Sequence, residues 1–254
     1  MTENNKTVIV TSFWNRPILI RSLYKSTSMS ASLPWRMLVV DNGSIGETKE
    51  WLRQWGSARS NVEIIEREPF SPNGENRRGS AEHGSALDFA MGHLRMEKSM
   101  VVIMDTDIIW LKPKWDKLFF EKLNNHDHVT THRKDCTECP APYISAFYMD
   151  FIHKNKIAFT PRLDEKMIVK KPTSMNDVGW MMNDYNGSGW CRLEHKTPGI
   201  GYARALAIRH ESDPIAEHLY AGRKRSAGRI IKWVDGCFNE LRKNIKKDLK
   251  NKKV

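Results

Sequence analysis

The sequence has no hydrophobic run that approaches the roughly 18 residues a membrane-spanning helix needs. Its hydrophobic content of 40% and charged content of 28% are those of an ordinary globular protein. The N-terminus, MTENNKTVIVTSFW, lacks the basic segment, apolar core and small-residue cleavage site of a signal peptide. We therefore expect a soluble, cytoplasmic protein.

Cysteines are few, four in 254 residues, and a cytoplasmic chain of this length buries a sizeable core without disulfides. The segment HRKDCTEC contains Cys136 and Cys139, and CRLEH contains Cys191 and His195. One interpretation is a structural zinc ion held by the three cysteines and one histidine. A single C-x-x-C is weak support, however. The alternative is that Cys136 and Cys139 are loop residues and that Cys191 packs in the core.

No internal repeat or low-complexity block precedes Ala221, and the excess of positive charge lies after it. Residues 221–254 contain 12 Lys and Arg against 3 Asp and Glu, a net charge of +9, whereas the first 220 residues contain 29 against 27. We expect residues 1–220 to form one α/β domain and residues 221–254 to form a basic helical tail.

Hydrophobic periodicity predicts alternating strands and helices. Short β-branched apolar runs predict strands at 6–13, 36–44, 62–66, 101–104, 128–131 and 144–150. Helical spacing predicts helices at 15–28, 48–55, 81–94 and 177–185, with a Pro/Gly/Asn-rich loop at 69–79. This alternation favours a mostly parallel sheet flanked by helices.

Two carboxylates, Asp105 and Asp107, directly follow the predicted strand at 101–104 in the stretch VVIMDTDIIW. The carboxyl ends of parallel strands are where open α/β sheets place their ligands. Because strand side chains alternate with a period of two, both carboxylates project the same way and can approach one divalent cation such as Mg²⁺ or Mn²⁺. The alternative is a pair of solvated acids in a turn.

Four segments follow one another as they do in nucleotide-sugar-dependent glycosyltransferases of the GT-A fold: VIVTSFWNRP, LVVDNGS, GSAEHGSALDFA and VVIMDTDIIWL. Over residues 6–119 the sequence resembles the inverting family-two type, with weaker similarity to His210. The resemblance implies a Rossmann-like domain in which residues 1–119 bind the nucleotide sugar and residues 120–220 face the acceptor.

The resemblance also implies roles for residues of the first half. Thr11, Trp14 and Arg16 are expected to line the nucleotide end of the cleft, and Asp41 to contact the base. Asp41 would equally cap a turn built on DNGS. His83 stands near a family motif that faces the diphosphate, although the match is inexact and an ordinary helix-surface histidine is the alternative.

The metal and the catalytic base follow from the same resemblance. Asp105 is expected near the ribose and sugar, Asp107 as the main metal ligand and His210 as the third ligand. Asp177 is the candidate base, with Asp184 behind it. Both assignments have alternatives, since Asp177 would also suit a helix cap and His210 a surface position.

The implied reaction is the metal-dependent transfer of a sugar from a nucleoside-diphosphate sugar, UDP-linked in our interpretation, to a hydroxyl acceptor. A cell-surface glycan or glycolipid intermediate is the expected acceptor. The arginine- and tryptophan-rich helix motif of membrane-bound family members is absent, so processive polymer synthesis is not expected. A retaining mechanism, which needs no base, stays open.

The tail has one apolar helical face with Lys and Arg on the others, formed by Ile230, Val234, Phe238, Leu241, Ile245 and Leu249. Such a helix can lie on an anionic membrane, bind nucleic acid or pack on the catalytic domain. A bacteriophage enzyme that glycosylates hydroxymethylated DNA bases is therefore the main alternative, and a non-catalytic nucleic-acid-binding protein a distant one. A nucleotidyltransferase is disfavoured because TSFWNRP is not a Gly-rich phosphate loop.

Overall fold

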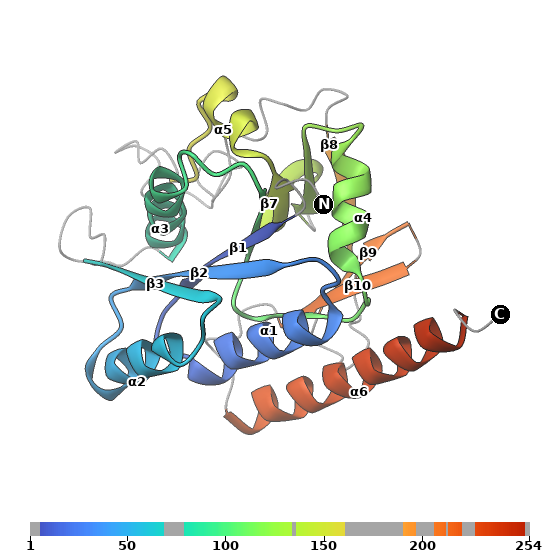
Figure 1. Ribbon diagram of the computed structural model, residues 1–254, viewed down its shortest axis with the longest axis horizontal. Coiled ribbons are helices and arrows are strands. Elements are labelled where there is room, and N and C mark those ends of the chain that lie inside the picture. The colour runs from blue at the N-terminus through green and yellow to red at the C-terminus, as the bar shows by residue number, and fades with distance from the viewer. Residues whose placement is uncertain are drawn as a thin grey trace.

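The computed structural model describes residues 6–68, 79–133, 136–160, 190–196, 206–211, 213–219 and 227–251. Within these ranges ten strands form one sheet, and helices cover both of its faces (Figure 1). The predicted α/β class is therefore confirmed, including the parallel arrangement of the first strands and the C-terminal helix.

One side of the sheet is entirely parallel and has the strand order β3-β2-β1-β4. Its strands are β1 (Thr7–Phe13), β2 (Trp35–Asn42), β3 (Val62–Arg67) and β4 (Met100–Met104). The helices that alternate with these strands in the chain are α1 (Pro17–Ser30), α2 (Gly46–Ser57) and α3 (Gly79–His93). Because the strands are parallel, all four carboxyl ends meet at one edge, which is called the carboxyl edge below.

The alternating side chains of β1 separate two hydrophobic clusters. Ile9 and Phe13 face a cluster that includes residues of α1 and α2, whereas Val8 and Val10 face a cluster built on α3. Figure 1 accordingly shows α1 and α2 on one face of the sheet and α3 on the other. Burial on both faces explains why these strands read as continuous apolar runs in the sequence.

The second half of the sheet is mixed. It consists of β5 (Ile108–Trp110), β6 (His128–Arg133), β7 (Cys136–Phe147), β8 (Trp190–Lys196), β9 (Leu206–His210) and β10 (Asp213–His218). From β4 outward the strand order is β7-β6-β8-β9-β10-β5, and apart from the parallel β6–β8 pair these strands pair antiparallel. This part also contains α4 (Trp115–Leu123).

The strand expected at 144–150 was placed too late. β7 begins at Cys136 and ends at Phe147, and Met149 starts the short helix α5 (Met149–Asn155). Cys136 and Cys139 therefore lie in a strand and not in a loop. The C-x-x-C segment lacks the alternation of apolar residues that marks a strand in sequence, and pairing with β6 supplies the structure instead.

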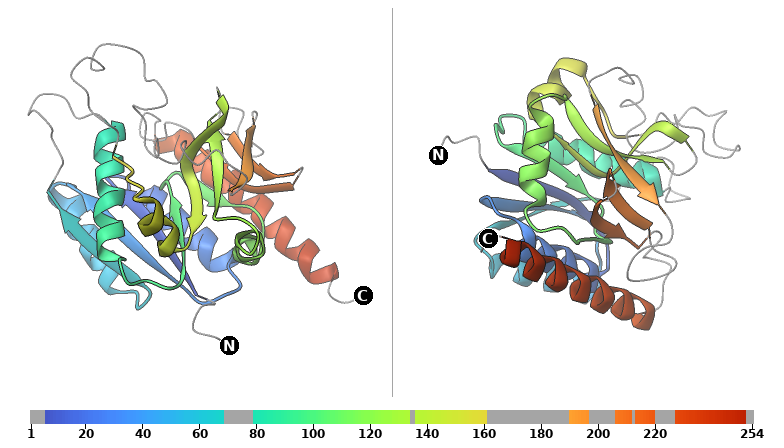
Figure 2. Two further views of the ribbon diagram at one scale, coloured as in Figure 1. Left: turned by 90° about the horizontal axis from the view of Figure 1, so that it is seen from above. Right: turned by 90° about the vertical axis from the view of Figure 1, so that its right-hand side faces the viewer.

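The basic tail forms α6 (Ala227–Asn251), which packs beside α1 (Figures 1 and 2). Ile230, Trp233, Cys237, Phe238 and Leu241 are buried in a third cluster, which also contains residues of α1 and β5. The apolar face of the tail is thus occupied by the domain itself. No helix among the described residues combines the length and hydrophobicity needed to cross a membrane.

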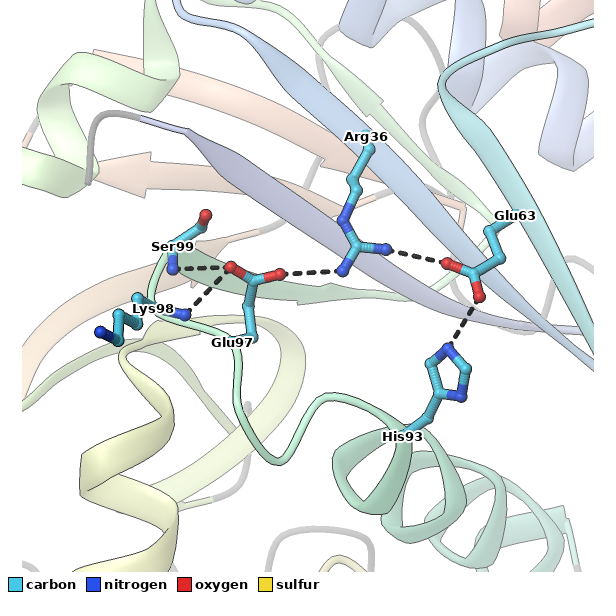
Figure 3. Close-up of polar contacts among 6 residues, drawn as sticks. All are labelled: Arg36, Glu63, His93, Glu97, Lys98 and Ser99. Atoms are coloured by element: carbon cyan, nitrogen blue, oxygen red, sulfur yellow. Dashed lines mark hydrogen bonds and ion pairs between the residues drawn. The ribbon is translucent and has the colours of Figure 1, made fainter. Parts of the chain in front are cut away.

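Surface ion pairs join the amino ends of the parallel strands (Figure 3). Arg36 donates to Glu63 at 2.9 Å and to Glu97 at 2.8 Å, and His93 lies 2.7 Å from the other oxygen of Glu63. A pocket of about 420 Å³, lined by the starts of β1 and β2 and by residues 96–99 just before β4, opens beside this network. This amino edge lies opposite the carboxyl edge, where the sequence predicted the site.

Candidate functional site

Asp105 and Asp107 lie in the tight connection between β4 and β5, at the carboxyl edge. Their backbone is fixed from two sides. The N–H of Asp105 donates to the carbonyl of Tyr143 at 3.1 Å, and the carbonyl of Asp107 accepts from the N–H of Leu219 at 2.9 Å. Both carboxylates are therefore held between β7 and the end of β10.

Two histidines from distant parts of the chain meet these carboxylates. His218, at the end of β10, places its Nε2 3.2 Å from an oxygen of Asp107 and 3.8 Å from one of Asp105. His83, on α3, lies 3.2 Å from the other oxygen of Asp105. The side chain of His218 is only 3% exposed, while Asp105 and His83 are each about a quarter exposed. The cluster thus has a buried side and a side open to ligands.

The electrostatics of His218 reflect its carboxylate neighbours. Burial by itself lowers the pKa of a histidine, because it penalises the charged form. The charges of Asp107 and Asp105 and the hydrogen bond to Asp107 outweigh burial, so the pKa of His218 is raised above its usual value. The cluster therefore favours positive charge at this position.

A divalent cation fits this donor set. One ligand atom each from Asp105, Asp107 and His218 can be chosen so that all three lie within 4.8 Å of one another. Ligand atoms about 2.1 Å from an octahedral cation are about 3 Å apart, close to the 3.2 Å between His218 and Asp107. Carboxylate and imidazole are ligand types that Mn²⁺ and related cations accept. The three residues thus form a candidate metal centre.

His210, the histidine expected to complete the metal site, is not part of this group among the described residues. It ends β9, its Nδ1 lies 4.0 Å from Glu211, and burial lowers its pKa. His218 was missed although it carries a similar signal, since PIAEH is also an apolar strand that ends in histidine. Only the pairing of β10 with β5 brings it beside Asp107.

Asp41 is the second-last residue of β2, is buried, and caps the turn that follows. Its Oδ1 accepts a hydrogen bond from the N–H of Ser44 at 2.9 Å, and Gly43 takes a φ of 77° in this turn. The N–H of Asn15 in turn donates to Ser44 Oγ at 3.3 Å, which ties the ends of β1 and β2 together. The structure contains the turn cap that the sequence offered as the alternative for Asp41. The contact with a base stays a prediction.

The three residues expected at the nucleotide end follow one another near the end of β1. Thr11 is fully buried within the strand, Trp14 is 42% exposed just beyond it, and Arg16 directly precedes α1. They lie at the same edge of the sheet as Asp105. Their role in binding a nucleotide stays a prediction.

Helix α3 also packs against the backbone of residues 159–160, which follow α5. Asp88 accepts hydrogen bonds from the N–H groups of Phe159 and Thr160 at 2.7 and 2.9 Å. Gly84, one turn earlier, has no room for a side chain, because a Cβ there would clash with the backbone carbonyl of Phe159. The segment GSALD therefore packs against the backbone of 159–160, next to His83.

Several predicted site residues cannot be placed. Asp177 and Asp184 lie outside the described residues, as do the side chains of Cys136, Cys139 and His195. Cys191 is buried and forms no disulfide. Strand register puts Cys191 beside Val129 and Cys136 beside Arg133. The zinc interpretation and the catalytic base stay predictions.

Solved structures with a similar fold include two that are described as glycosyltransferases, WbbM and GlyE, and S. aureus TarS. They include residues 1–349 of S. aureus TarS in complex with UDP (16% identity, TM-score 0.50, 74% of this chain and 57% of that chain). The bifunctional WbbM aligns over 96% of this chain and 52% of its own (15% identity, TM-score 0.59). GlyE of Streptococcus pneumoniae TIGR4 aligns over 96% and 64% (12% identity, TM-score 0.53).

These likenesses establish a shared fold, and the chain spans about half to two thirds of the length of those proteins. No curated protein sequence matches the chain. The model of the family described as glycosyl transferase family 2 matches residues 7–170, which is more than half of the chain and includes Asp105, Asp107 and the strands that position them. The expected GT-A architecture is thus confirmed, and the chain belongs to glycosyl transferase family 2.

Proposed function

We propose that the chain is a metal-dependent glycosyltransferase that moves a sugar from a nucleoside-diphosphate sugar to a hydroxyl acceptor. The convergence of Asp105, Asp107 and His218 at the carboxyl edge, in a chain of family 2, carries this proposal. Ligands of open α/β sheets bind at this edge. Two carboxylates and an imidazole that converge there form a donor set that a divalent cation can bind.

Asp105, Asp107 and His218 would hold Mn²⁺ or Mg²⁺. When bound, such a cation supplies positive charge that stabilises the leaving diphosphate. In this proposal His218 takes the place first assigned to His210, because it is the histidine within 3.2 Å of Asp107.

The donor nucleotide would lie along the ends of β1 and β2. Thr11, Trp14 and Arg16 would contact it, with the guanidinium of Arg16 suited to a phosphate, and Asp41 would contact the base. His83, which lies 3.2 Å from Asp105, would face the sugar diphosphate. We propose UDP as the nucleotide, and the complex of TarS with UDP supports this choice.

The reaction would be inverting, with Asp177 taking the proton of the acceptor hydroxyl and Asp184 behind it. A base near the acceptor contributes typically 10²- to 10⁴-fold to such a transfer. Asp177→Asn is expected to lower turnover by that order and leave donor binding unchanged. An unchanged turnover would favour a retaining mechanism.

The acceptor would be a cell-surface glycan or glycolipid met at an anionic membrane, and the outer face of α6 supports this. Two exposed apolar side chains, Ile231 and Leu249, lie 18 residues apart, which is five helical turns and hence one line along the helix. Exposed cations lie beside this line on α6 and on the adjacent α1: Arg21, Lys25, Arg229, Lys232, Arg242, Lys243, Lys246, Lys247 and Lys250. Basic side chains beside exposed apolar ones suit anionic lipid headgroups.

DNA is the alternative acceptor, because the same cations would also bind duplex phosphates. Sedimentation with vesicles containing anionic lipid, compared with vesicles of neutral lipid and with binding to a DNA duplex, separates the two. Binding to anionic vesicles that Ile231→Ser and Leu249→Ser weaken supports the lipid surface. Duplex binding that falls steeply with salt and ignores both substitutions would favour DNA.

Donor binding is tested by thermal unfolding of the purified chain with a panel of nucleotide sugars and free nucleotides, with and without Mn²⁺. A ligand at a hundredfold its dissociation constant adds about 2.7 kcal/mol to the free energy of unfolding. We expect one nucleotide sugar to stabilise the chain only with Mn²⁺, and Asp107→Ala to abolish this effect. If no nucleotide sugar stabilises the wild-type chain with metal present, the proposal fails, and a non-catalytic nucleic-acid-binding protein becomes the better hypothesis.

A further inference from the structure

Strand β10 has two successive buried side chains that face opposite sides of the sheet, as neighbouring strand residues do. His218 faces the carboxylates of Asp105 and Asp107. Glu217 accepts a hydrogen bond from Nε1 of Trp233 on α6, at 3.0 Å. Glu217 and Trp233 are fully buried and His218 is 2% exposed. One residue of β10 thus belongs to the metal centre and the next to the interface with α6.

The hydrogen bond between Glu217 and Trp233 lies in mostly apolar surroundings. A buried carboxylate is costly unless a donor meets it, and the indole N–H can only donate. Cys237 lies close enough that burial and the nearby Glu217 raise the pKa of its thiol. The side chains around this polar group, including Ile109, Leu111 and Leu241, are apolar. A hydrogen bond between helix and strand in such surroundings favours one relative position of the two.

The end of β10 is also connected to the backbone of the carboxylate pair. Glu217 pairs with Ile109 and His218 with Ile108 in the β10–β5 ladder. The N–H of Leu219, the next residue, donates to the carbonyl of Asp107 at 2.9 Å. Because Glu217 and His218 are adjacent in this ladder, a contact that fixes Glu217 also limits how far His218 can move relative to Asp107.

We propose that Glu217 and Trp233 are positioning residues that hold the imidazole of His218 in place for metal binding. This inference rests on the proposed metal-dependent function and extends it to α6. The C-terminal helix then contributes to the metal centre through a buried contact, independently of its basic outer face.

The test compares the Mn²⁺ affinity of full-length variants by electron paramagnetic resonance of free Mn²⁺. Trp233→Phe keeps an aromatic ring but removes the N–H, and we expect about tenfold weaker Mn²⁺ binding, as for other groups that orient metal ligands. Glu217→Gln keeps an acceptor for the indole N–H and is expected to bind Mn²⁺ nearly as well as wild type. Leu241→Val, in the same cluster, is the control for a purely apolar loss.

A double variant distinguishes a loss of Mn²⁺ binding caused by a misplaced His218 from one caused by poor folding. Glu217→Met with Trp233→Phe replaces both partners of the Glu217–Trp233 hydrogen bond by apolar groups, a change that can be nearly neutral for stability. We expect this variant to unfold at a denaturant concentration close to that of wild type and still to bind Mn²⁺ about tenfold more weakly.

If the inference is right, the loss of Mn²⁺ affinity in Trp233→Phe depends on the presence of His218. In a His218→Gln background, Trp233→Phe is expected to cause no further loss of Mn²⁺ affinity, because the ligand it positions is already gone. Normal Mn²⁺ binding by Trp233→Phe, or equal losses in Trp233→Phe and Leu241→Val, would overturn the inference alone. A wild-type chain that binds no Mn²⁺ would overturn the proposed function and this inference with it.

Discussion

Two buried histidines lie at opposite edges of the sheet and differ in the direction of their pKa shifts. His128 starts β6 and is 1% exposed, and His218 ends β10 and is 2% exposed. Each ring has an aromatic neighbour with its centroid 4.7 Å away, Phe151 and Tyr143 respectively. Burial and the nearby His126 lower the pKa of His128 to about 4, whereas Asp107 and Asp105 reverse the effect of burial at His218. Carboxylate neighbours, not burial, distinguish the two.

The carboxylates at the two edges differ in the same way. At the amino edge, the guanidinium of Arg36 lies between Glu63 and Glu97, and Glu97 also accepts the N–H groups of Lys98 and Ser99 (Figure 3). These acids are matched by fixed donors and complete a structural network. At the carboxyl edge, Asp105 and Asp107 converge on histidines, which are neutral when they bind metal. We infer that the first arrangement stabilises the fold and the second is a site for a cation.

The largest effect is expected for Asp107→Asn. The substitution keeps the size of the side chain and removes the charge that attracts the cation. Turnover of the donor identified by the thermal panel should fall about 10³-fold or more, measured as release of free nucleotide. Loss of less than tenfold would show that Asp107 is not a metal ligand needed for transfer.

A smaller effect is expected for His218→Gln, which removes one proposed ligand and keeps both carboxylates. Mn²⁺ affinity should fall about 100-fold, at the upper end of what changes around metal sites cause. The matched substitution at the other edge, His128→Gln, should leave Mn²⁺ affinity unchanged. Equal Mn²⁺ affinities of the two variants would remove the distinction between the edges.

The pH dependence of the free energy of unfolding should show the contribution of His128. Its pKa is about 4 in the folded chain against 6.5 for an ordinary histidine, so between these values the unfolded chain binds more protons. Its contribution is present above pH 6.5 and is lost as the pH falls toward 4, by about 3 kcal/mol. Urea unfolding at pH 7 and 4.5 should show a smaller loss for His128→Phe than for wild type. Parallel losses in both would contradict this assignment.

The smallest effect is expected at the amino-edge network. Burial raises the pKa of Glu97, but hydrogen bonds from Arg36 and Ser99 outweigh it and lower the pKa to about 2, against 4.5 normally. The contribution is therefore present above pH 4.5 and disappears as the pH falls toward 2. Glu97→Gln should cost about 1 kcal/mol in the free energy of unfolding at pH 7. Mn²⁺ binding should be unaffected, and a change in it would argue against separate roles for the edges.

The sequence predicted the parallel half of the fold well, and the mixed half poorly. β1, β2 and β4 are apolar runs buried on both faces, and this composition is visible locally. β5 has three residues, and its pairing with β10 joins segments about a hundred residues apart. Such pairings are decided by tertiary packing and leave no local signal.

The candidate site likewise contains residues that local sequence predicts and residues that only long-range packing places. Asp105 and Asp107 could be found because their spacing and the preceding strand are local features. The choice between His210 and His218 could not be made, since each ends an apolar strand and only the order β9-β10-β5 in the sheet decides which one meets Asp107. The contact between His83 and Asp105 likewise depends on how α3 packs on the sheet.

The most direct test of the metal centre is calorimetric titration of Mn²⁺ into the chain in the presence of UDP, for wild type, Asp107→Asn and Glu97→Gln. Our account predicts one Mn²⁺ per chain for wild type and Glu97→Gln, and none detectable for Asp107→Asn. Equal Mn²⁺ binding by wild type and Asp107→Asn, or no binding by wild type, would contradict it.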